Sequence, residues 1–201
     1  MDELPLADRL VETGSFRIDR ARALEKLRDY QLPDPSLYAA VLVRCAVASG
    51  ATEIRFDALT RETGVEISFD GRPFSAEELE YPYGALLAGA APETDRNREL
   101  AIALLALLRF KPARVLLRSG APGSRFQLAI ASLESESLTP SEDPAGKTVI
   151  RAIAAGPQCA FWRPEVHKRL RGNCRFSPIP VRFEEETASR LGLAACRDDE
   201  L

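Results

Sequence analysis

The sequence predicts an α+β fold, because apolar helices and pairs of short alternating strands follow one another along its 201 residues. A helix is expected over 37–48, and it must be enclosed on nearly all sides because only Arg44 in it is charged. Alternating apolar and polar residues follow at 52–59 and 65–69, with a polar turn between them, which is typical of a hairpin. A second apolar helix, over 95–110, leads into another pair of alternating segments.

The composition is that of an ordinary globular protein, with 45% apolar and 28% charged residues. We expect one domain over 15–185, with a polar arm at 1–14 before it and a tail at 186–201 after it. No apolar run approaches the length of a membrane span, and the acidic first residues do not resemble a signal peptide, so a cytoplasmic location is expected. The net charge of -3 says little about partners.

The cysteines give no reason to expect a metal site. The chain has four cysteines without any C-x-x-C spacing, and its one histidine is His167. Reduced and mostly buried thiols are the expected state of Cys45, Cys159, Cys174 and Cys196.

Capping residues mark the starts of the helices in the first half of the chain. Phe16 and Ile18 alternate like a brief strand, and Asp19 is placed to cap a helix that runs to Tyr30. Asp34 is placed to cap the next helix, with a proline at its first position. Ser75-Ala76-Glu77-Glu78 has the form of a capping box, which opens a further short helix.

The second half is expected to continue the sheet. Residues 80–97 show no clear period and are expected to form a flexible loop, and Pro112 ends the helix over 95–110. The acidic, serine-rich segment 132–145 is most simply a solvated loop. Further strands are expected at 115–118, 126–130, 146–154 and 179–183, with a helix at 165–170.

Residues 41–52 read VLVRCAVASGAT, which resembles the central-helix motif E-L-V-x-N-x-x-D-A-G-A-T of the GHKL ATPases. That superfamily includes the ninety-kilodalton heat-shock chaperones, MutL mismatch-repair proteins, type II topoisomerases and sensor histidine kinases. In the family the glutamate activates water and the asparagine ligates magnesium, and the motif spacing puts these positions on one helix face. The corresponding residues here are Val41, Cys45 and Ala48. None of them can act as a general base for water or supply the oxygen ligand that magnesium prefers.

The family's adenine-binding motif, D-x-G-x-G, is similar to residues 69–74. Without gaps, Phe69 replaces its aspartate, Pro73 replaces its second glycine, and Gly71 is retained. A shift of one residue would put Asp70 at the adenine position. Asp70 could equally be a turn residue before a glycine.

The remaining motifs keep the family's order but not its chemistry. The segment that corresponds to the glycine-rich phosphate motif, 99–104, contains no glycine, so the backbone around Ala103 cannot approach a phosphate closely. Residues 146–150 resemble a G-T-containing strand, with Thr148 displaced by one position, and 174–181 resemble the end of the chaperone ATP-binding domain. The resemblance covers about 15–185. It implies a two-layer sandwich whose mixed, largely antiparallel sheet is covered on one face by helices.

Our main hypothesis is therefore a catalytically inactive pseudo-ATPase that serves as a protein-interaction or scaffold module, with another protein as its partner. ATP and magnesium are not expected as cofactors, and no catalytic residue is assigned. The remnants of the nucleotide pocket would be Val41, Cys45, Ala48, Asp70, Gly71, Ala103 and Thr148.

Two alternatives remain open at this stage. One is an ATP-binding protein with slow hydrolysis, which would use Asp70 for adenine. The other is a nucleic-acid accessory protein that binds through a basic segment, 163–182, although a solvated helix face explains that segment more simply. The basic residues concerned are Arg163, Lys168, Arg169, Arg171, Arg175 and Arg182.

Overall fold

The computed structural model describes residues 19–87, 95–142, 146–156, 164–183 and 186–188. Its helices are α1 (Arg20–Tyr30), the 3₁₀ helix η1 (Pro35–Leu37), α2 (Tyr38–Ala48), α3 (Ala76–Glu80), α4 (Gly84–Leu87), α5 (Asp95–Leu108) and α6 (Pro164–Asn173). Its strands are β1 (Ile54–Ala58), β2 (Gly64–Phe69), β3 (Arg114–Ala121), β4 (Ser124–Ser132), β5 (Ser135–Ser141), β6 (Thr148–Ile153), β7 (Val181–Phe183) and β8 (Glu186–Thr187). The arm at 1–14 and the brief strand expected at Phe16 and Ile18 lie outside the described residues.

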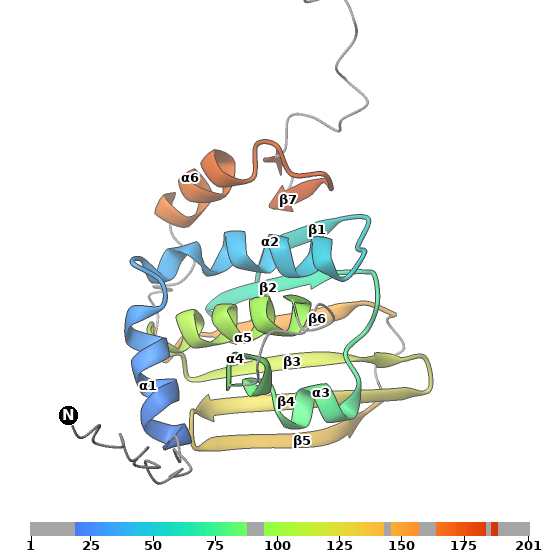
Figure 1. The fold of residues 1–201 in the computed structure, drawn as a ribbon. Coiled ribbons are helices and arrows are strands. Elements are labelled where there is room, and N and C mark those ends of the chain that lie inside the picture. The colour runs from blue at the N-terminus through green and yellow to red at the C-terminus, as the bar shows by residue number, and fades with distance from the viewer. Residues whose placement is uncertain (1–18, 88–94, 143–145, 157–163, 184–185, 189–201) are drawn as a thin grey trace, which may run out of the picture.

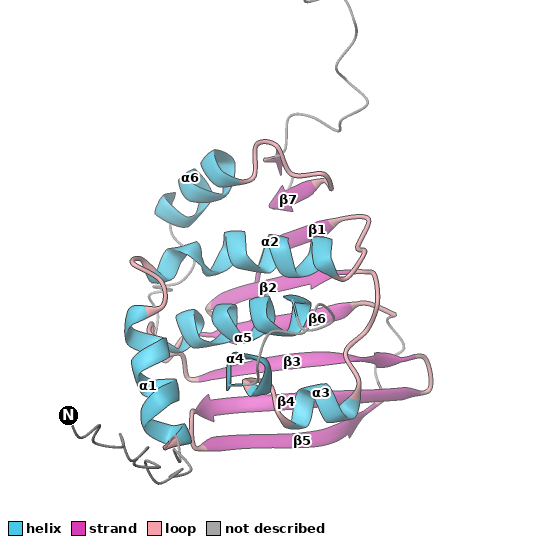
Figure 2. Ribbon diagram, viewed as in Figure 1, coloured by secondary structure: helices cyan, strands magenta, loops and turns pink. Residues whose placement is uncertain are grey.

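The described strands form one eight-stranded sheet in the order β5-β4-β3-β6-β2-β1-β7-β8. All neighbours are antiparallel except β1 and β7, which run parallel. Helices α1 to α5 lie on one face of this sheet, and α6 lies beyond η1 and α2 at the β7 end (Figures 1 and 2). The predicted α+β class is confirmed, with a mixed and mostly antiparallel sheet.

Helix α1 and the 3₁₀ helix η1 begin where the capping residues predict. The Asp19 carboxylate accepts a hydrogen bond from the Arg22 backbone N–H at 3.2 Å, which satisfies one donor of the first turn of α1. The Asp34 carboxylate accepts from the Ser36 backbone N–H at 2.8 Å, but the turn that it caps is η1, one turn before α2. The starts of both segments could therefore be located from the sequence, although the 3₁₀ geometry could not.

Helix α2 lies in the middle of the core, as its apolar sequence predicts. Tyr38, Leu42 and Cys45 have no exposed surface, and the helix packs against α5 and over the sheet. Solvent reaches the helix mainly at Arg44, Val47 and Ala48. Burial of its other side chains is the main contribution of this helix to stability.

The two faces of the sheet differ in chemistry. Residues that point towards the helices, such as Phe56, Ile67 and Leu117, are fully buried. On the opposite face polar side chains pair across neighbouring strands. For example, Arg151 Nε donates to Glu66 Oε2 at 2.5 Å. Because one face of the sheet is buried and the other is polar, apolar and polar residues alternate along the strands.

Two sequence predictions about loops were wrong. Much of the solvated loop expected over 132–145 is strand β5, which pairs with β4. Its serine-rich composition is that of an exposed edge strand, so composition alone hides the alternation around Leu138. The loop expected over 80–97 contains the short helix α4, and its last residues belong to α5. Residues 88–94 lie outside the described part of the chain.

Gly71 joins the end of β2 to the end of α2 through a close backbone approach. Its φ is +93°, and a Cβ atom at this position would lie 2.6 Å from the Ser49 carbonyl oxygen. The next residue, Arg72, donates its backbone N–H to the same oxygen at 2.8 Å. Only glycine therefore fits this junction without displacing the backbone.

Gly71→Ala is expected to lower the free energy of unfolding by about 2–3 kcal/mol, because strain at positive φ adds to the clash. Gly123→Ala is the matched control, since Gly123 has a φ of +80° but nothing within 4 Å of the added Cβ. The control should lose only about 1 kcal/mol. Urea unfolding measures both values, and equal losses would show that the close approach at Gly71 is not a constraint.

Among the described residues, no helix combines the length and the apolar character that a membrane span needs.

Candidate functional site

The residues at the three central-helix motif positions do not share one environment. Val41 is 4% exposed and Cys45 is 0% exposed, and both belong to the core, whereas Ala48 is exposed on the last turn of α2. The expectation that the helix over 37–48 is enclosed on nearly all sides is therefore wrong at Ala48. Ala48 is the last residue of α2 and lies on the same exposed side of the helix as Arg44 and Val47.

Cys45 is a buried hydrogen-bond donor rather than a reactive thiol. Its Sγ donates to the backbone carbonyl oxygen of Arg96 at 3.5 Å, which connects α2 to the first turn of α5. Burial raises the pKa of the Cys45 thiol to about 12. Because the thiolate is the nucleophilic form, Cys45 has no such role at neutral pH.

The Asp70 side chain is hydrogen-bonded to the loop between α2 and β1. Its carboxylate accepts hydrogen bonds from the Thr52 backbone N–H at 2.7 Å, the Thr52 hydroxyl at 2.5 Å and the Glu53 backbone N–H at 3.2 Å. Burial by itself would raise the pKa of Asp70, but these hydrogen bonds outweigh it and lower the pKa. Gly71, the next residue, is exposed at the junction with α2. Both oxygens of this carboxylate therefore already accept hydrogen bonds from within the chain.

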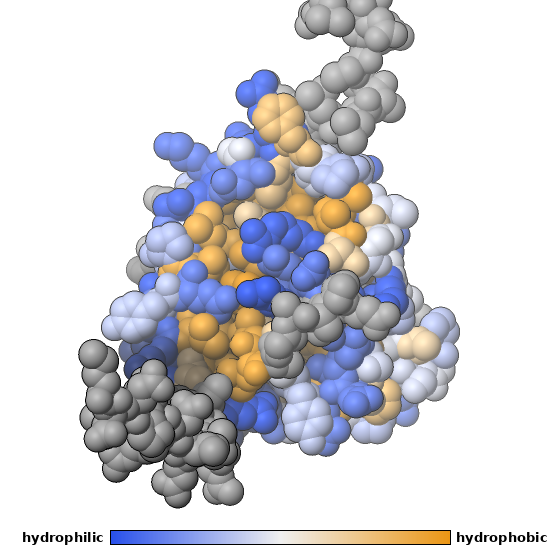
Figure 3. All heavy atoms as spheres, in the orientation of Figure 1, coloured by the Kyte–Doolittle hydropathy of each residue, from blue (hydrophilic) through white to orange (hydrophobic). Residues whose placement is uncertain are grey.

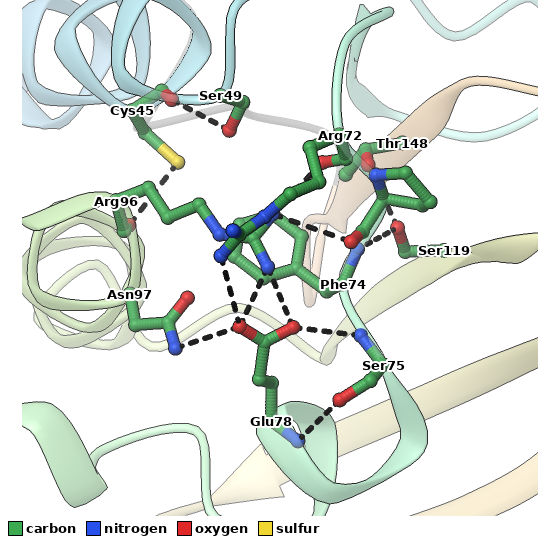
Figure 4. A network of polar contacts seen from close by, with 11 residues as sticks. Cys45, Ser49, Arg72, Phe74, Ser75, Glu78, Arg96, Asn97, Ser119 and Thr148 are labelled. Atoms are coloured by element: carbon green, nitrogen blue, oxygen red, sulfur yellow. Dashed lines mark hydrogen bonds and ion pairs between the residues drawn. The ribbon is translucent and has the colours of Figure 1, made fainter. Parts of the chain in front are cut away.

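A buried arginine, Arg96, lies between α2 and the segment that follows β2 (Figure 4). Its side chain is 4% exposed. Nη2 donates to both carboxylate oxygens of Glu78 at 2.6 Å, and Nη1 donates to the carbonyl oxygens of Arg72 at 2.8 Å and Pro73 at 3.2 Å. Its Cζ lies 4.4 Å from the centre of the Phe74 ring, which is a cation–π distance. We call Arg72, Pro73, Phe74, Ser75, Glu78, Arg96 and Asn97 the Arg96 cluster.

Glu78 is the acidic centre of this cluster. It closes the predicted capping box of α3, since its Oε2 accepts from the Ser75 backbone N–H at 2.8 Å and its own N–H donates to Ser75 Oγ at 3.2 Å. Asn97 Nδ2 donates to Oε1 at 3.0 Å. Burial would raise the pKa of Glu78, but its hydrogen bonds and the nearby guanidinium lower it. The carboxylate is therefore ionised where it meets Arg96.

The cluster rests on the sheet through Phe74. The Phe74 backbone N–H donates to Ser119 Oγ at 2.9 Å, and this hydroxyl lies 2.8 Å from Thr148 Oγ1. Thr148, one of the predicted pocket remnants, is 3% exposed beneath the cluster, and Ala103 is fully buried in α5. Figure 4 shows Cys45, Phe74, Arg96 and Thr148 close together, although they come from four separate parts of the chain.

The sequence alone did not indicate the roles of Arg96 and Phe74. One signal was available for Arg96, because a basic residue in the first turn of a helix meets the positive end of the helix dipole and needs a compensating partner. The capping box identified Glu78, but only as a helix cap. Nothing local connects positions 78 and 96, because residues 81–94 separate α3 from α5 and the pairing arises from tertiary packing.

Acidic neighbours neutralise much of the basic C-terminal segment. Arg169 pairs with Asp34, Arg171 pairs with Glu186, and Arg182 lies 3.6 Å from Glu53. Lys168 is exposed. These pairs weaken the case for a nucleic-acid surface, which needs cations that can reach phosphates.

The rest of the basic segment carries a cation–π pair and a surface pocket. Arg175 lies 5.4 Å from the centre of the Phe176 ring, and Phe176 is 73% exposed. Nearby, a surface pocket of about 420 Å³ is lined by Arg171, Arg175, Glu186, Thr187 and Ala188. His167 lies 5.0 Å from the ring of Phe183, and Arg163 is outside the described residues.

Within the described part of the chain, no group of three or more His, Cys, Asp or Glu residues is placed to hold a metal ion. Models of known protein families give no match to this chain, and neither do curated protein sequences.

Proposed function

We propose that this chain is a GHKL-like domain without ATPase activity, which serves as a protein-interaction or scaffold module. The observation that carries the proposal is the Arg96 cluster. Where the resemblance places a nucleotide, beside the central helix and the segment after β2, the chain has the buried side chains of Phe74 and Arg96. The order of α2, the β1–β2 hairpin, α3, α5 and the following strands supports the same ancestry.

Energetics argue against a nucleotide in this position. ATP would have to displace Arg96 and separate its guanidinium from the Glu78 carboxylate. Separating a buried ion pair in this way costs about 3–5 kcal/mol. Such a cost weakens binding by a factor of roughly 10²–10⁴, and no residue at 41 or 45 can offset it through a magnesium ion.

Exposed aromatic side chains support an interaction role. Tyr30 is 82% exposed, Tyr81 is 55% exposed and Phe176 is 73% exposed. Aromatic residues are enriched in the cores of protein interfaces, where burying them contributes strongly to binding. Figure 3 shows that apolar surface also reaches solvent among hydrophilic side chains around α2 and α5. A partner protein would therefore find apolar contacts on the helical face.

Calorimetric titration with magnesium-ATP tests the absence of nucleotide chemistry. We expect no saturable heat and no phosphate release above the buffer rate from protein whose folding is verified by circular dichroism on the same sample. Asp70→Asn is the discriminating variant. Saturable binding with turnover that this substitution abolishes, without unfolding the protein, would contradict the proposal and favour an ATP-binding function.

A further inference from the structure

We propose that Glu78, the face of Phe74 and the carbonyl groups of Arg72 and Pro73 form a binding site for a guanidinium group, which Arg96 fills from within the chain. The site would then bind an alkylguanidinium, such as an arginine side chain or a small guanidinium compound, whenever Arg96 is absent. This inference depends only on the geometry of the cluster and not on the ancestry of the fold.

The acceptors match a guanidinium in number and direction. A guanidinium is planar, and its N–H groups lie in a fixed fork. One end of the fork meets both oxygens of Glu78, and the other meets the two carbonyl oxygens of Arg72 and Pro73. The Phe74 ring covers one face of the plane at 4.4 Å. The edge and the face of the cation are therefore both recognised.

The site is held in shape by contacts that do not involve Arg96. The capping box with Ser75 fixes the Glu78 carboxylate, and Ser119 fixes the backbone of Phe74. The Arg72 backbone N–H is bonded to Ser49 on α2. Removing the Arg96 side chain would thus leave an organised set of acceptors, and such preorganisation favours binding.

The site should distinguish a guanidinium from an ammonium ion. A lysine ammonium is a compact charge with three donors, so it cannot reach the carboxylate and both carbonyl groups while lying flat on the ring. Arg96 Nε has no hydrogen-bond partner among the described residues, so only the two terminal nitrogens are recognised. An alkyl group on the third nitrogen is therefore compatible with the site, as the stem of Arg96 shows.

Arg96 also couples two elements that are distant in sequence. Its backbone carbonyl accepts from Cys45 on α2, and its side chain holds the segment before α3. Because Arg96 is tethered beside the site, its effective concentration there exceeds what a free ligand reaches at low concentration. The native protein should therefore bind no free guanidinium compound, whereas Arg96→Ala should do so.

The test compares the melting temperatures of the wild type, Arg96→Ala and Arg96→Lys in millimolar methylguanidinium, methylammonium or sodium chloride at constant ionic strength. Methylguanidinium is expected to raise the melting temperature of Arg96→Ala by about 3–5 °C at concentrations well above its Kd. It should not stabilise the wild type, and Arg96→Lys should not reach wild-type stability. Adding Glu78→Gln to Arg96→Ala should abolish the stabilisation.

Recovery of folded protein provides a second measurement if Arg96→Ala does not fold alone. On dilution from urea, methylguanidinium should restore folded Arg96→Ala, and methylammonium should not. Equal effects of the three salts, or no effect of methylguanidinium in either measurement, would overturn the proposal. Stabilisation that persists in the Arg96→Ala/Glu78→Gln double variant would also overturn it, because the ligand would then bind elsewhere.

Discussion

Val41→Glu, which introduces the glutamate of the family motif, is expected to lower the free energy of unfolding by at least about 4 kcal/mol. Val41 is 4% exposed and belongs to the apolar core, where burying an ionised carboxylate is costly. Cys45→Asn, the second motif residue, buries an amide at a fully buried position and should lose about 1–3 kcal/mol. Urea unfolding followed by circular dichroism measures both losses.

Ala48 provides the matched control, because it belongs to the same motif but is exposed. Ala48→Asn should cost less than about 1 kcal/mol, which is the difference in helix propensity. The central helix would instead face an open, hydrated cleft if Val41→Glu and Cys45→Asn were tolerated as well as Ala48→Asn.

Glu78→Ala is expected to lower the free energy of unfolding by about 3–5 kcal/mol, because it leaves the Arg96 guanidinium buried without its carboxylate. The Arg96 side chain is 4% exposed and that of Glu78 is 22% exposed, so solvent can compensate only in part. Arg96→Met alone should also be costly. The double variant should lose less than the sum of the two single losses, by more than about 1 kcal/mol, since the first substitution already removes the shared interaction.

Because of Glu78, the free energy of unfolding should also depend on pH. The folded pKa of Glu78 is lowered, so its contribution to stability is present above the unfolded pKa and is lost as pH falls through the folded value. The unfolded value is about 4.3, so the loss should develop below about pH 5. Glu78→Gln should flatten this part of the stability curve. Glu77→Gln, which alters the exposed neighbouring acid on α3, should leave it unchanged. If the stability of Glu78→Gln fell below pH 5 as steeply as that of the wild type, the ion pair would contribute little to stability.

The elements that the sequence predicted well have local causes. The apolar run of α2, the alternation of β1 and β2, and the Ser75–Glu78 capping box all depend on residues within a few positions of one another. Strand β5 escaped prediction because serine fills the side of the strand away from the core, so its alternation looks like a polar loop. Leu138 lies between Ser137 and Thr139 in this strand. That alternation of polar and apolar residues indicates a strand, whereas the overall composition does not.

The candidate site was harder to predict because its contacts are long-range. Asp70 finds its partners at Thr52 and Glu53, across the β1–β2 hairpin, and Glu78 finds Arg96 across the segment that contains α4. Both carboxylates could be recognised from the sequence as turn or capping residues. Their second role appears only when the sheet and α5 bring distant residues together.

Amide hydrogen exchange in the presence and absence of saturating magnesium-ATP tests most directly whether the chain itself fills the position beside the central helix. We predict that protection of the amides in 38–52, 70–80 and 95–108 will be the same with and without the nucleotide, because Arg96 and Phe74 already occupy that position. This prediction would be contradicted if magnesium-ATP increased the protection of these three segments and magnesium chloride alone did not.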